Sequence, residues 1–267
     1  VALTISDDYP VEAWKIKGSN GKTYDNIQTA IDEAADAGGG EVWIAAGTYK
    51  HGAPLTMKNN VAIYGGFAGT ETSKEDRVAG NNTILDGEGS YQVFNNTYTD
   101  ANPLTNSAKL DNVIIQNGSA SNGAGMYNYY ASPEITNCTF SNNSASKEGG
   151  GMYNNSSSPT LINCTFSGNS ASDDGGGMYN WSSSPVLTNC TFANNSATGD
   201  YSDGGGMYNY YSSSPVLTNC TFANNSALRY AGGMYNYNYN SSSPELTNCT
   251  FSGNCAESGG GMYNVSS

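Results

Sequence analysis

Four aspartates lie in the connecting segments of two neighbouring sequence repeats, and carboxylates at such positions can do chemistry. Asp173 and Asp174 belong to one segment, and Asp200 and Asp203 belong to the next. Two carboxyl groups about 5–10 Å apart can hydrolyse a glycoside, and several hard oxygen ligands can bind Ca²⁺. We favour a third interpretation, a solvated acidic corner, and keep the hydrolase site and the Ca²⁺ site as alternatives.

Aromatic residues give a second candidate, a surface that binds. Each repeat contains Gly-Met-Tyr, in which Met and Tyr face opposite ways along a strand. We expect Met inside, because Met fills irregular core space, and Tyr outside, because its hydroxyl needs a polar partner. The expected outward column consists of Tyr127, Tyr153, Tyr179, Tyr208, Tyr235 and Tyr263. The segment that follows the column adds Tyr129, Tyr130, Trp181, Tyr210, Tyr211, Tyr237 and Tyr239.

Such an aromatic surface suits two kinds of partner. Exposed aromatic patches usually mark a binding site. Sugar faces stack on flat rings, and protein interfaces are rich in Tyr and Trp. The competing interpretation is a stacking ladder that only stabilises the fold, and the repeat pattern leaves both open.

The charge of the chain excludes other partners. The 267 residues carry a formal net charge of −13, and after Leu110 the only cations are Lys147 and Arg229. Nucleic acids and anionic membrane surfaces need clustered Lys and Arg, so neither is expected as a partner. The same charge repels anionic polymers, which disfavours a polyuronate lyase. Apolar runs of about 18 residues are absent from the sequence, so no membrane insertion is expected.

The cysteines and the single histidine form no motif of a metal site or catalytic triad. Five cysteines recur at spacings of 26, 26, 30 and 29 residues, namely Cys138, Cys164, Cys190, Cys220 and Cys249. Zinc sites use more closely spaced pairs, so these thiols are expected to be small buried hydrophobes. Cys255 is a candidate for a disulfide with Cys249. His51 is interpreted as a surface residue.

The repeats indicate the elements that position these side chains. Five units end in Asn-Cys-Thr-Phe, and a degenerate unit at 110–120 has Val113 in the Cys place and Ile115 in the Phe place. Each unit offers three short β-like pieces, separated by turn-forming Asn, Gly, Ser and Pro. Three short strands per repeat fit one coil of a parallel β-solenoid, whose coils stack about 4.8 Å apart.

A period of two residues along each strand assigns the inside and the outside of a coil. Cys and Phe share the inward face with Leu161, Leu187, Leu217 and Leu246. The Asn before each Cys is expected to turn a corner, because Asn tolerates the left-handed backbone conformation. Stacked amides are then expected to hydrogen-bond along the axis. These corner residues are Asn137, Asn163, Asn189, Asn219 and Asn248.

The first hundred residues differ from the repeats. We expect a cap over 1–40 with an amphipathic helix from Asp25 or Asn26 to about Ala35. Its apolar face consists of Ile27, Ala30, Ile31 and Ala34. Irregular coils follow over 41–109 and regular coils over 110–267, within one continuous domain. A helix at this place covers the open end of a solenoid, where an exposed edge invites aggregation.

These stretches carry a resemblance to known proteins. IQTAIDEAADAGGGEVWIAAGTY, LTMKNNVAIYGGFAGTE and TILDGEGSYQVF resemble the N-terminal region of right-handed parallel β-helix proteins of the pectate-lyase-like superfamily. The repeats resemble those of bacterial surface proteins of the polymorphic outer-membrane protein type. The resemblance implies an all-β, right-handed parallel β-helix with an N-terminal capping helix. It leaves function open, because the superfamily includes lyases, glycoside hydrolases, phage tailspikes and adhesins.

We therefore expect a secreted or cell-surface protein with a structural or adhesive role and no catalytic activity. Its aromatic surface is expected to contact other surface proteins or glycans, and no cofactor is expected apart from the Ca²⁺ alternative. The sequence stops part-way through a coil at GGGMYNVSS. Two expectations follow from this and stay open: either more chain follows, or a second copy covers this end in an end-to-end fibre. The alternative is a carbohydrate-active β-helix enzyme, a polysaccharide hydrolase or lyase.

Overall fold

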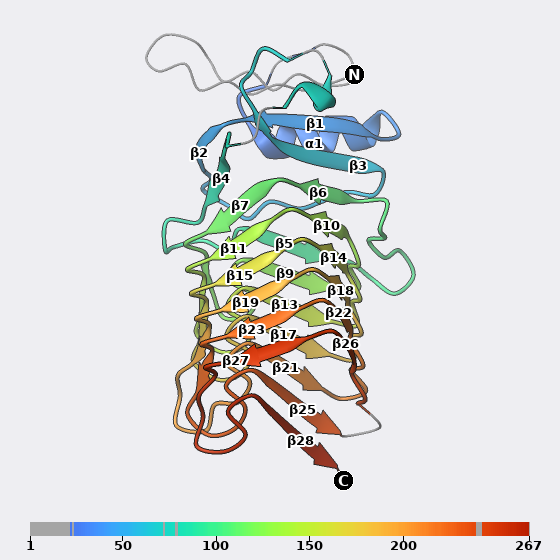
Figure 1. Cartoon of the computed structure of the whole chain (residues 1–267). Helices are drawn as coiled ribbons and strands as arrows, with labels where there is room; N and C mark the ends of the chain where they lie inside the picture. Colours follow the sequence, from blue (N-terminus) through green and yellow to red (C-terminus); the bar gives the residue numbers. More distant parts are fainter. Residues whose placement is uncertain (1–21, 23, 72, 78–79, 239–241, 267) are drawn as a thin grey trace.

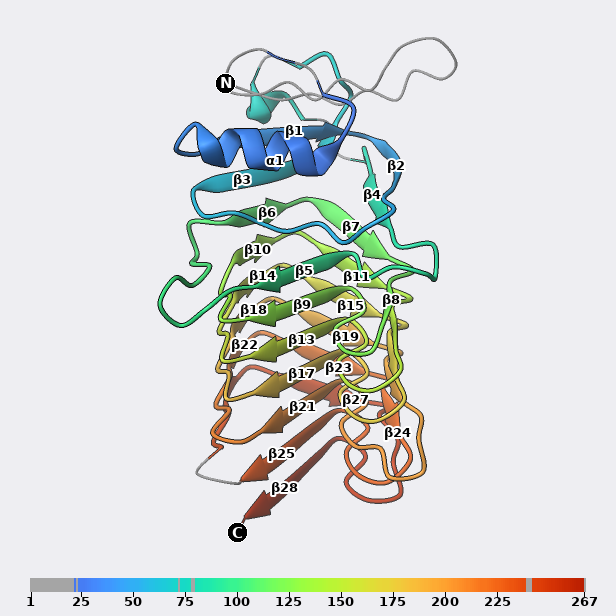
Figure 2. The same cartoon turned by 180° about the vertical axis from the view of Figure 1, so that it is seen from behind.

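A computed structural model describes residues 22, 24–71, 73–77, 80–238 and 242–266. Residues 1–21 of the predicted cap lie outside the described residues. One α-helix, α1 (Ile27–Asp36), lies at one end of a long stack of parallel strands (Figure 1). The strands form four sheets along the stack, which is an elongated solenoid from both sides (Figure 2). The predicted all-β parallel solenoid with a helix at its N-terminal end is therefore confirmed.

Two of the sheets contain eight strands each. The leucine sheet consists, in spatial order, of β1 (Gly40–Ala45), β3 (Val61–Phe67), β6 (Lys109–Asp111), β10 (Glu134–Thr136), β14 (Thr160–Ile162), β18 (Val186–Thr188), β22 (Val216–Thr218) and β26 (Glu245–Thr247). The phenylalanine sheet consists of β2 (Gly47–Lys50), β4 (Thr83–Asp86), β7 (Val113–Gln116), β11 (Thr139–Ser141), β15 (Thr165–Ser167), β19 (Thr191–Ala193), β23 (Thr221–Ala223) and β27 (Thr250–Ser252).

The remaining two sheets complete each coil. The methionine sheet consists of β5 (Phe94–Thr97), β9 (Met126–Tyr129), β13 (Met152–Asn155), β17 (Met178–Trp181), β21 (Met207–Tyr210), β25 (Met234–Asn238) and β28 (Met262–Ser266). The serine–alanine sheet consists of the two-residue strands β8 (Ser119–Ala120), β12 (Ser144–Ala145), β16 (Ser170–Ala171), β20 (Ser196–Ala197) and β24 (Ser226–Ala227). This sheet adds a fourth strand to the three strands predicted for each coil. It forms because a second residue with a left-handed backbone, such as Asn194 with φ 56°, turns the chain after the phenylalanine sheet.

Identical side chains stack on one another through the core. Parallel, in-register pairing places Leu161 beside Leu187 and Phe166 beside Phe192, and all four are fully buried. The rings of Phe166 and Phe192 are 4.7 Å apart and parallel within 3°. The predicted inward columns are confirmed, and burial of their apolar surface is the main driving force for folding of the regular coils. In the last described coil the columns are only partly buried, at Leu246, Cys249 and Phe251.

The predicted corner asparagines turn the chain between the leucine and phenylalanine sheets. All five have a left-handed backbone, with φ between 52° and 55°. Their amides form a ladder along the axis, in which Asn189 Nδ2 donates to Asn163 Oδ1 at 3.1 Å. The corner prediction and the amide ladder are both confirmed.

Two further amide ladders, which were not predicted from the sequence, lie inside the fold. In the methionine sheet, Asn154 Nδ2 donates to Asn180 Oδ1 at 2.9 Å. Beside the serine–alanine sheet, Asn169 Nδ2 donates to Asn195 Oδ1, also at 2.9 Å. All four side chains are fully buried. Burial of an amide requires such partners, so each coil must supply an Asn at both places.

Helix α1 closes the N-terminal end of the described stack. Asn26 caps it, since its side chain accepts a hydrogen bond from the N–H of Thr29 at 3.0 Å. The predicted apolar face, Ile27, Ala30, Ile31 and Ala34, is buried and belongs to the main core cluster. The predicted helix and its role as a cover are therefore confirmed.

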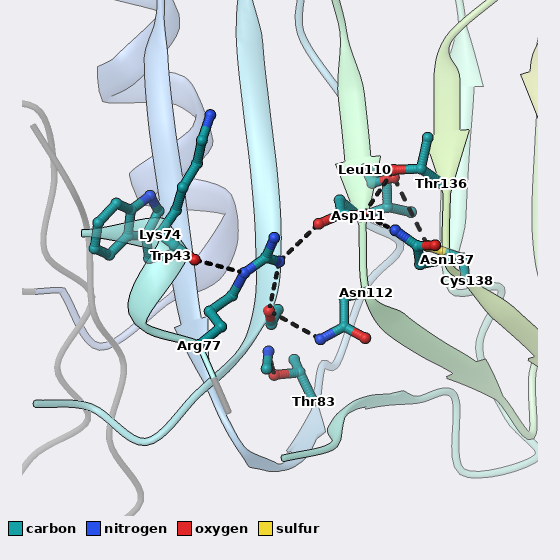
Figure 3. A network of polar contacts seen from close by, with 12 residues as sticks. Trp43, Lys74, Arg77, Thr83, Leu110, Asp111, Asn112, Thr136, Asn137 and Cys138 are labelled. Carbon is teal, nitrogen blue, oxygen red and sulfur yellow. Dashed lines mark hydrogen bonds and ion pairs between the residues drawn. The ribbon is translucent and has the colours of Figure 1, made fainter. Parts of the chain in front are cut away.

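An ion pair joins the irregular coils to the first regular coil (Figure 3). Arg77, which follows the 3-10 turn η1 (Lys74–Asp76), donates from Nη1 to Asp111 Oδ2 at 2.6 Å. The other oxygen, Asp111 Oδ1, accepts from Thr136 Oγ1 and from Asn137 Nδ2, both at 2.7 Å. The Asp111 side chain is 10% exposed. Asp111 is thus the acceptor at which the ladder of corner asparagines begins.

Candidate functional site

The predicted tyrosine column is a stack of rings on the outer face of the methionine sheet. Met178 lies in the main core, whereas Tyr179 belongs to a second cluster outside it, so the predicted orientation of Met and Tyr is confirmed. The ring of Tyr179 is 5.1 Å from that of Tyr153 and 5.0 Å from that of Tyr208. The stack extends to Tyr127, Tyr235 and Tyr263.

The prediction that this column is exposed is wrong. Four of its side chains are between 3% and 7% exposed, namely Tyr153, Tyr179, Tyr208 and Tyr235, and Tyr127 and Tyr263 are partly buried. The loop before each Gly-Met-Tyr strand lies over the rings. A Cβ atom on Gly175 would be only 3.0 Å from the Cβ of Tyr179, so this close approach requires glycine. The column matches the alternative interpretation, a stacking ladder.

Three carboxylates lie in the loops that cover the column. Glu148, Asp174 and Asp203 each precede a glycine at the same place in successive coils. The N–H of Gly149 donates to the Asp174 carbonyl at 3.0 Å, and the N–H of Gly175 donates to the Asp203 carbonyl at 3.1 Å. Asp174 Oδ1 accepts from the Asp203 N–H at 2.9 Å. Glu148 was not among the predicted site residues, although its place directly before Gly-Gly-Gly was a signal.

Burial changes the acidity of this group. It raises the pKa of the Asp174 carboxyl to about 7, opposed by the hydrogen bond from the Asp203 N–H and reinforced by the charges of Asp203 and Glu148. Burial also raises the pKa of Glu148, and the charge of Asp173 adds to this effect. Burial raises the pKa of the Tyr179 hydroxyl as well. Asp174 therefore changes charge in the neutral range, where ordinary aspartates stay ionised.

The four predicted aspartates do not come together as ligands. Asp173 and Asp200 are exposed. Asp203 is buried in a bidentate ion pair with Arg229, whose Nη2 and Nε donate at 2.6 and 3.0 Å. Among the described residues, which include all four aspartates, no group of three or more Asp, Glu, His or Cys could hold a metal ion. The arrangement does not support the Ca²⁺ alternative. The favoured solvated corner is confirmed for Asp173 and Asp200 and is wrong for Asp203, which is buried, while Asp174 is partly buried.

Aromatic side chains at the ends of the methionine-sheet strands remain open to solvent. Trp181 is 39% exposed and Tyr211 is 37% exposed, and their aromatic neighbours are partly buried. We call this surface the aromatic shelf, and its members are Tyr129, Tyr130, Trp181, Tyr210, Tyr211 and Tyr237. Tyr239, also predicted here, lies outside the described residues. The open part of the predicted aromatic surface is therefore this shelf.

Strand register places the shelf residues side by side. Trp181 pairs with Tyr210, and their rings meet edge to face at 5.3 Å. The ring of Tyr237 is 5.6 Å from that of Tyr210. Asn155 separates the two aromatic groups, since it pairs with Tyr129 on one side and with Trp181 on the other. The shelf thus consists of two aromatic groups with a polar gap of one coil.

Two members of the shelf have a strained backbone. Tyr130 and Tyr211 have φ of 49° and 48°, at the place where Ser156 and Ser182 lie in the coils between them. A bulky residue in this region costs about 1–3 kcal/mol, and such strain is typical of functional sites. Serine is the easier choice there. Each of these tyrosines contacts the ring of the residue before it, Tyr130 that of Tyr129 at 4.7 Å and Tyr211 that of Tyr210 at 6.2 Å.

A polar ladder behind the shelf fixes its position. Ser183 Oγ donates to the Trp181 carbonyl at 2.7 Å, and Ser213 Oγ donates to the Tyr210 carbonyl at 2.6 Å. Each hydroxyl also accepts the backbone N–H of the preceding coil, as Ser213 Oγ does from Ser183 at 3.1 Å. These hydrogen bonds therefore fix the backbone at the strand ends that carry the rings.

The sequence places this chain among known folds. A family model described as a right-handed β-helix region matches residues 105–267, which is more than half of the chain. The chain belongs to the right-handed β-helix family. The pectate-lyase-like resemblance is consistent with this membership. For this β-helix, a search of curated proteins and a search of solved structures each gave no match.

The predicted disulfide of this β-helix is wrong, because both partners are free thiols. Cys249 ends the thiol column at the corner before the phenylalanine sheet, and it is half-buried. Cys255 is exposed and pairs by its backbone with Ser226, on the line of the serine–alanine sheet. The two residues thus belong to different sides of the coil. Burial raises the pKa of the Cys138 thiol to about 12, so this thiol stays protonated at neutral pH.

Two further observations concern the surface of the β-helix. His51 is a half-buried residue at the surface near the start of α1, and burial lowers its pKa. Within the described part of the chain, no helix has the length and apolar character needed to cross a membrane.

Proposed function

We propose that this right-handed β-helix is a non-catalytic structural protein that adheres to glycans through the aromatic shelf. The observation that carries the proposal is the shelf itself. It keeps the rings of Trp181 and Tyr211 more than a third exposed at one corner of the coils, and Tyr130 and Tyr211 have a left-handed backbone there. Flat rings held on a rigid scaffold stack on sugar faces with little loss of conformational entropy.

The charge of the chain favours a neutral glycan over an anionic one. The net charge is −13, and the two cations of the regular coils lie elsewhere. Arg229 is held by Asp203 in a loop over the tyrosine column, and Lys147 precedes Glu148 in another such loop. Neutral ligands avoid the repulsion that an acidic surface imposes on polyanions. Other surface proteins are a second class of partner, because interfaces are rich in Tyr and Trp.

A surface or extracellular location is part of the proposal. The sequence supports it with few charges, many Asn, Ser, Thr and Gly residues, and a resemblance to bacterial surface repeats. End-to-end association of copies stays an expectation. Sedimentation at rising protein concentration tests it, and a single monomeric species at every concentration would contradict it.

A glycan array with matched variants tests the adhesive function. We expect the wild type to bind neutral glycans and Trp181→Ala to lose about five- to 150-fold in affinity, if a sugar stacks on one aromatic residue with the same energy of about 1–3 kcal/mol that a nucleic-acid base contributes. Tyr201→Ala is the control, because Tyr201 is 78% exposed and lies outside the shelf. Equal binding by both variants, or no glycan bound by the wild type, would contradict the proposal.

A specific observation supports a second candidate, a carbohydrate-active enzyme. The Asp174 carboxyl, with a pKa of about 7, is protonated often enough at neutral pH to act as a general acid, and Glu148 lies in the adjacent loop. The test is release of reducing ends from neutral polysaccharides by wild type, Asp174→Asn and Glu148→Gln. Activity lost in both variants would establish the enzyme, and absence of activity in the wild type would eliminate it.

A further inference from the structure

The two most exposed large hydrophobic side chains of the described residues belong to adjacent segments of successive coils. Tyr201 is 78% exposed and Leu228 is 53% exposed. Their segments are joined, because the N–H of Leu228 donates to Ser202 Oγ at 3.3 Å and the N–H of Arg229 donates to the Ser202 carbonyl at 3.0 Å. Leu228 directly follows β24, which Figure 2 shows on one side of the solenoid. Exposed hydrophobic side chains that gather in this way usually mark a site of interaction.

The stacking of the solenoid explains neither of these two residues. Leu228 occupies the position that Ser172 and Thr198 occupy in the preceding coils, since each of them directly follows a strand of the serine–alanine sheet. Tyr201 lies in the segment between β19 and β21, which is longer than the corresponding segment between β15 and β17. Both hydrophobic residues are therefore departures from the repeat rather than parts of it.

Arg229 fixes the base of this surface. Its Nη2 and Nε donate to the buried Asp203 carboxylate at 2.6 and 3.0 Å, and Asp203 Oδ1 also accepts from the Tyr230 N–H at 3.1 Å. The guanidinium carbon of Arg229 lies 5.9 Å from the centre of the Tyr201 ring and 4.9 Å from that of the Tyr230 ring. We call Tyr201, Leu228 and Arg229 the loop patch. A surface held in this way loses little conformational entropy when a partner binds.

The rim of the loop patch is negatively charged. Asp200 is exposed and directly precedes Tyr201. Glu257 is also exposed and lies beside Leu228, because its N–H donates to the Leu228 carbonyl at 3.3 Å. The charge of Arg229 is balanced by its ion pair with Asp203, so Asp200 and Glu257 give the rim its sign. Such a rim attracts cations and repels anions.

We propose that the loop patch is a docking site for a basic protein segment, in which an apolar side chain is flanked by Lys or Arg. The apolar side chain packs against Tyr201 and Leu228, and the flanking cations pair with Asp200 and Glu257. A second copy of this chain fits poorly, because its net charge is also −13 and like charges repel. Strands β21 and β25 begin after the two loops and end at the aromatic shelf, so the docking site is separate from the shelf.

Fluorescence anisotropy of short labelled peptides tests the chemistry of the partner. The probes are a peptide of Lys, Leu and Gly, a counterpart with Glu in place of every Lys, and a counterpart with Ser in place of every Leu. We expect the wild type to bind the Lys–Leu peptide with a dissociation constant on the order of 10 μM, as befits a small contact. Each counterpart should bind about tenfold more weakly. Absence of binding to the Lys–Leu peptide, or equal binding of the Glu–Leu peptide, would overturn the proposal.

Matched variants locate the binding on the loop patch. Leu228→Ser introduces the residue that another coil has as Ser172, so the variant should fold, and it should weaken binding about tenfold. Val186→Thr is the control, because Val186 is 43% exposed in the leucine sheet and pairs with Thr160 of the neighbouring coil. Trp181→Ala on the shelf should also leave peptide binding unchanged. Equal losses in Leu228→Ser and Val186→Thr, or a loss in Trp181→Ala, would contradict a separate docking site.

A double variant tests the acidic rim. Asp200→Asn with Glu257→Gln should weaken binding of the Lys–Leu peptide about fivefold at low salt, as the loss of two exposed ion pairs implies. Asp100→Asn with Glu245→Gln is the control, since it removes the same charge from exposed positions elsewhere. Equal weakening by the two double variants would contradict a role of the rim. Self-association of the wild type in sedimentation that Leu228→Ser abolishes would make a second copy the occupant and would overturn the proposal.

Discussion

The coils before residue 105 and the coils after it hold together by different means. In the later coils the same uncharged side chains recur at the same places, so that Phe192 stacks on Phe166 and on Phe222. In the earlier part no two coils are alike. Helix α1 packs on β1 and β3, Arg77 pairs with Asp111, and the side chain of Tyr98 donates to the Met57 carbonyl.

This difference determines how each region responds to damage. A contact in the regular coils has a copy in the coils on either side, so its loss leaves the neighbouring coils intact, as in other one-dimensional repeats. A contact in the N-terminal region has no copy. Its loss therefore releases an element, such as the loop that carries Arg77, rather than one rung of a ladder.

The largest effect is expected from the core of the regular coils. Phe192→Ala removes a fully buried ring and its stacking on both sides, and the expected loss of unfolding free energy is about 4 kcal/mol. Urea denaturation followed by circular dichroism measures it. Thr191→Ala, one residue away on the outward face of β19, is the control and should change stability by less than about 0.5 kcal/mol. Similar effects of the two variants would refute the stacked core.

The next effect in size is expected from the ion pair between Arg77 and Asp111. Asp111→Ala leaves Arg77 without its carboxylate and removes the acceptor of Thr136 and Asn137. We expect a loss of about 2 kcal/mol, less than for a fully buried pair, because the Arg77 side chain is 24% exposed.

The control for this variant lies in the neighbouring coils. Glu134→Ala breaks the more exposed ion pair with Lys109 and should cost less than about 1 kcal/mol. Hydrogen exchange should also locate the damage of Asp111→Ala in residues 73–77, next to the new gap. A loss of protection that is spread evenly over the regular coils would contradict a local effect of Asp111→Ala.

A further effect is expected from pH, and it belongs to the regular coils. The pKa of Asp174 is raised to about 7 in the folded chain, so folding favours its protonated form. The resulting stability is fully present below pH ~4, the ordinary Asp range, and is lost as the pH rises through 7. Asp174→Asn should abolish this decline in melting temperature between pH 4 and 8.

Several charged groups face Asp174 and set this response. They are Glu148, Asp173 and Asp203, the last of which is paired with Arg229, while Tyr179 and Tyr208 lie beside them. Asp173→Asn is the control, because Asp173 is exposed, and the decline should persist in it. A pH profile that is identical in wild type and Asp174→Asn would contradict the assignment to Asp174.

Repetition made much of the scaffold predictable. A period of two residues placed Leu187 and Phe192 inside, and the preference of Asn for the left-handed region placed Asn189 at a corner. These predictions hold because in-register stacking requires every coil to have the same shape. The helix was predictable for a different reason, namely an N-cap before a periodic apolar face.

The same argument was incomplete for the candidate site. The two-residue period of the strand predicts that Tyr179 points away from the core. It does not predict the loops that cover Tyr179, because the path of a loop depends on distant contacts such as the hydrogen bond from the Asp203 N–H to Asp174. His51 lies in a stretch with no repeat to compare, so its partial burial near the start of α1 depends on tertiary packing alone. The buried Asn180 ladder had a signal, an Asn after every Met-Tyr, which was assigned no role.

The amide ladders give the solenoid a direction. Inside the fold, the hydrogen bonds from one ladder amide to the next run toward the C-terminal coil, as from Asn154 Nδ2 to Asn180 Oδ1 and from Asn169 Nδ2 to Asn195 Oδ1. At the corner the sense is reversed, because Asn163 donates back to Asn137, which donates to Asp111. A carboxylate accepts but cannot donate. In the corner ladder the last acceptor lies in the N-terminal coil, so an acidic residue fits there, as Asp111 does. In the inner ladders the last acceptor lies in the C-terminal coil, so an acidic residue at any earlier position would interrupt the ladder. A change of Asn to Asp thus has opposite consequences at the two ends of this molecule.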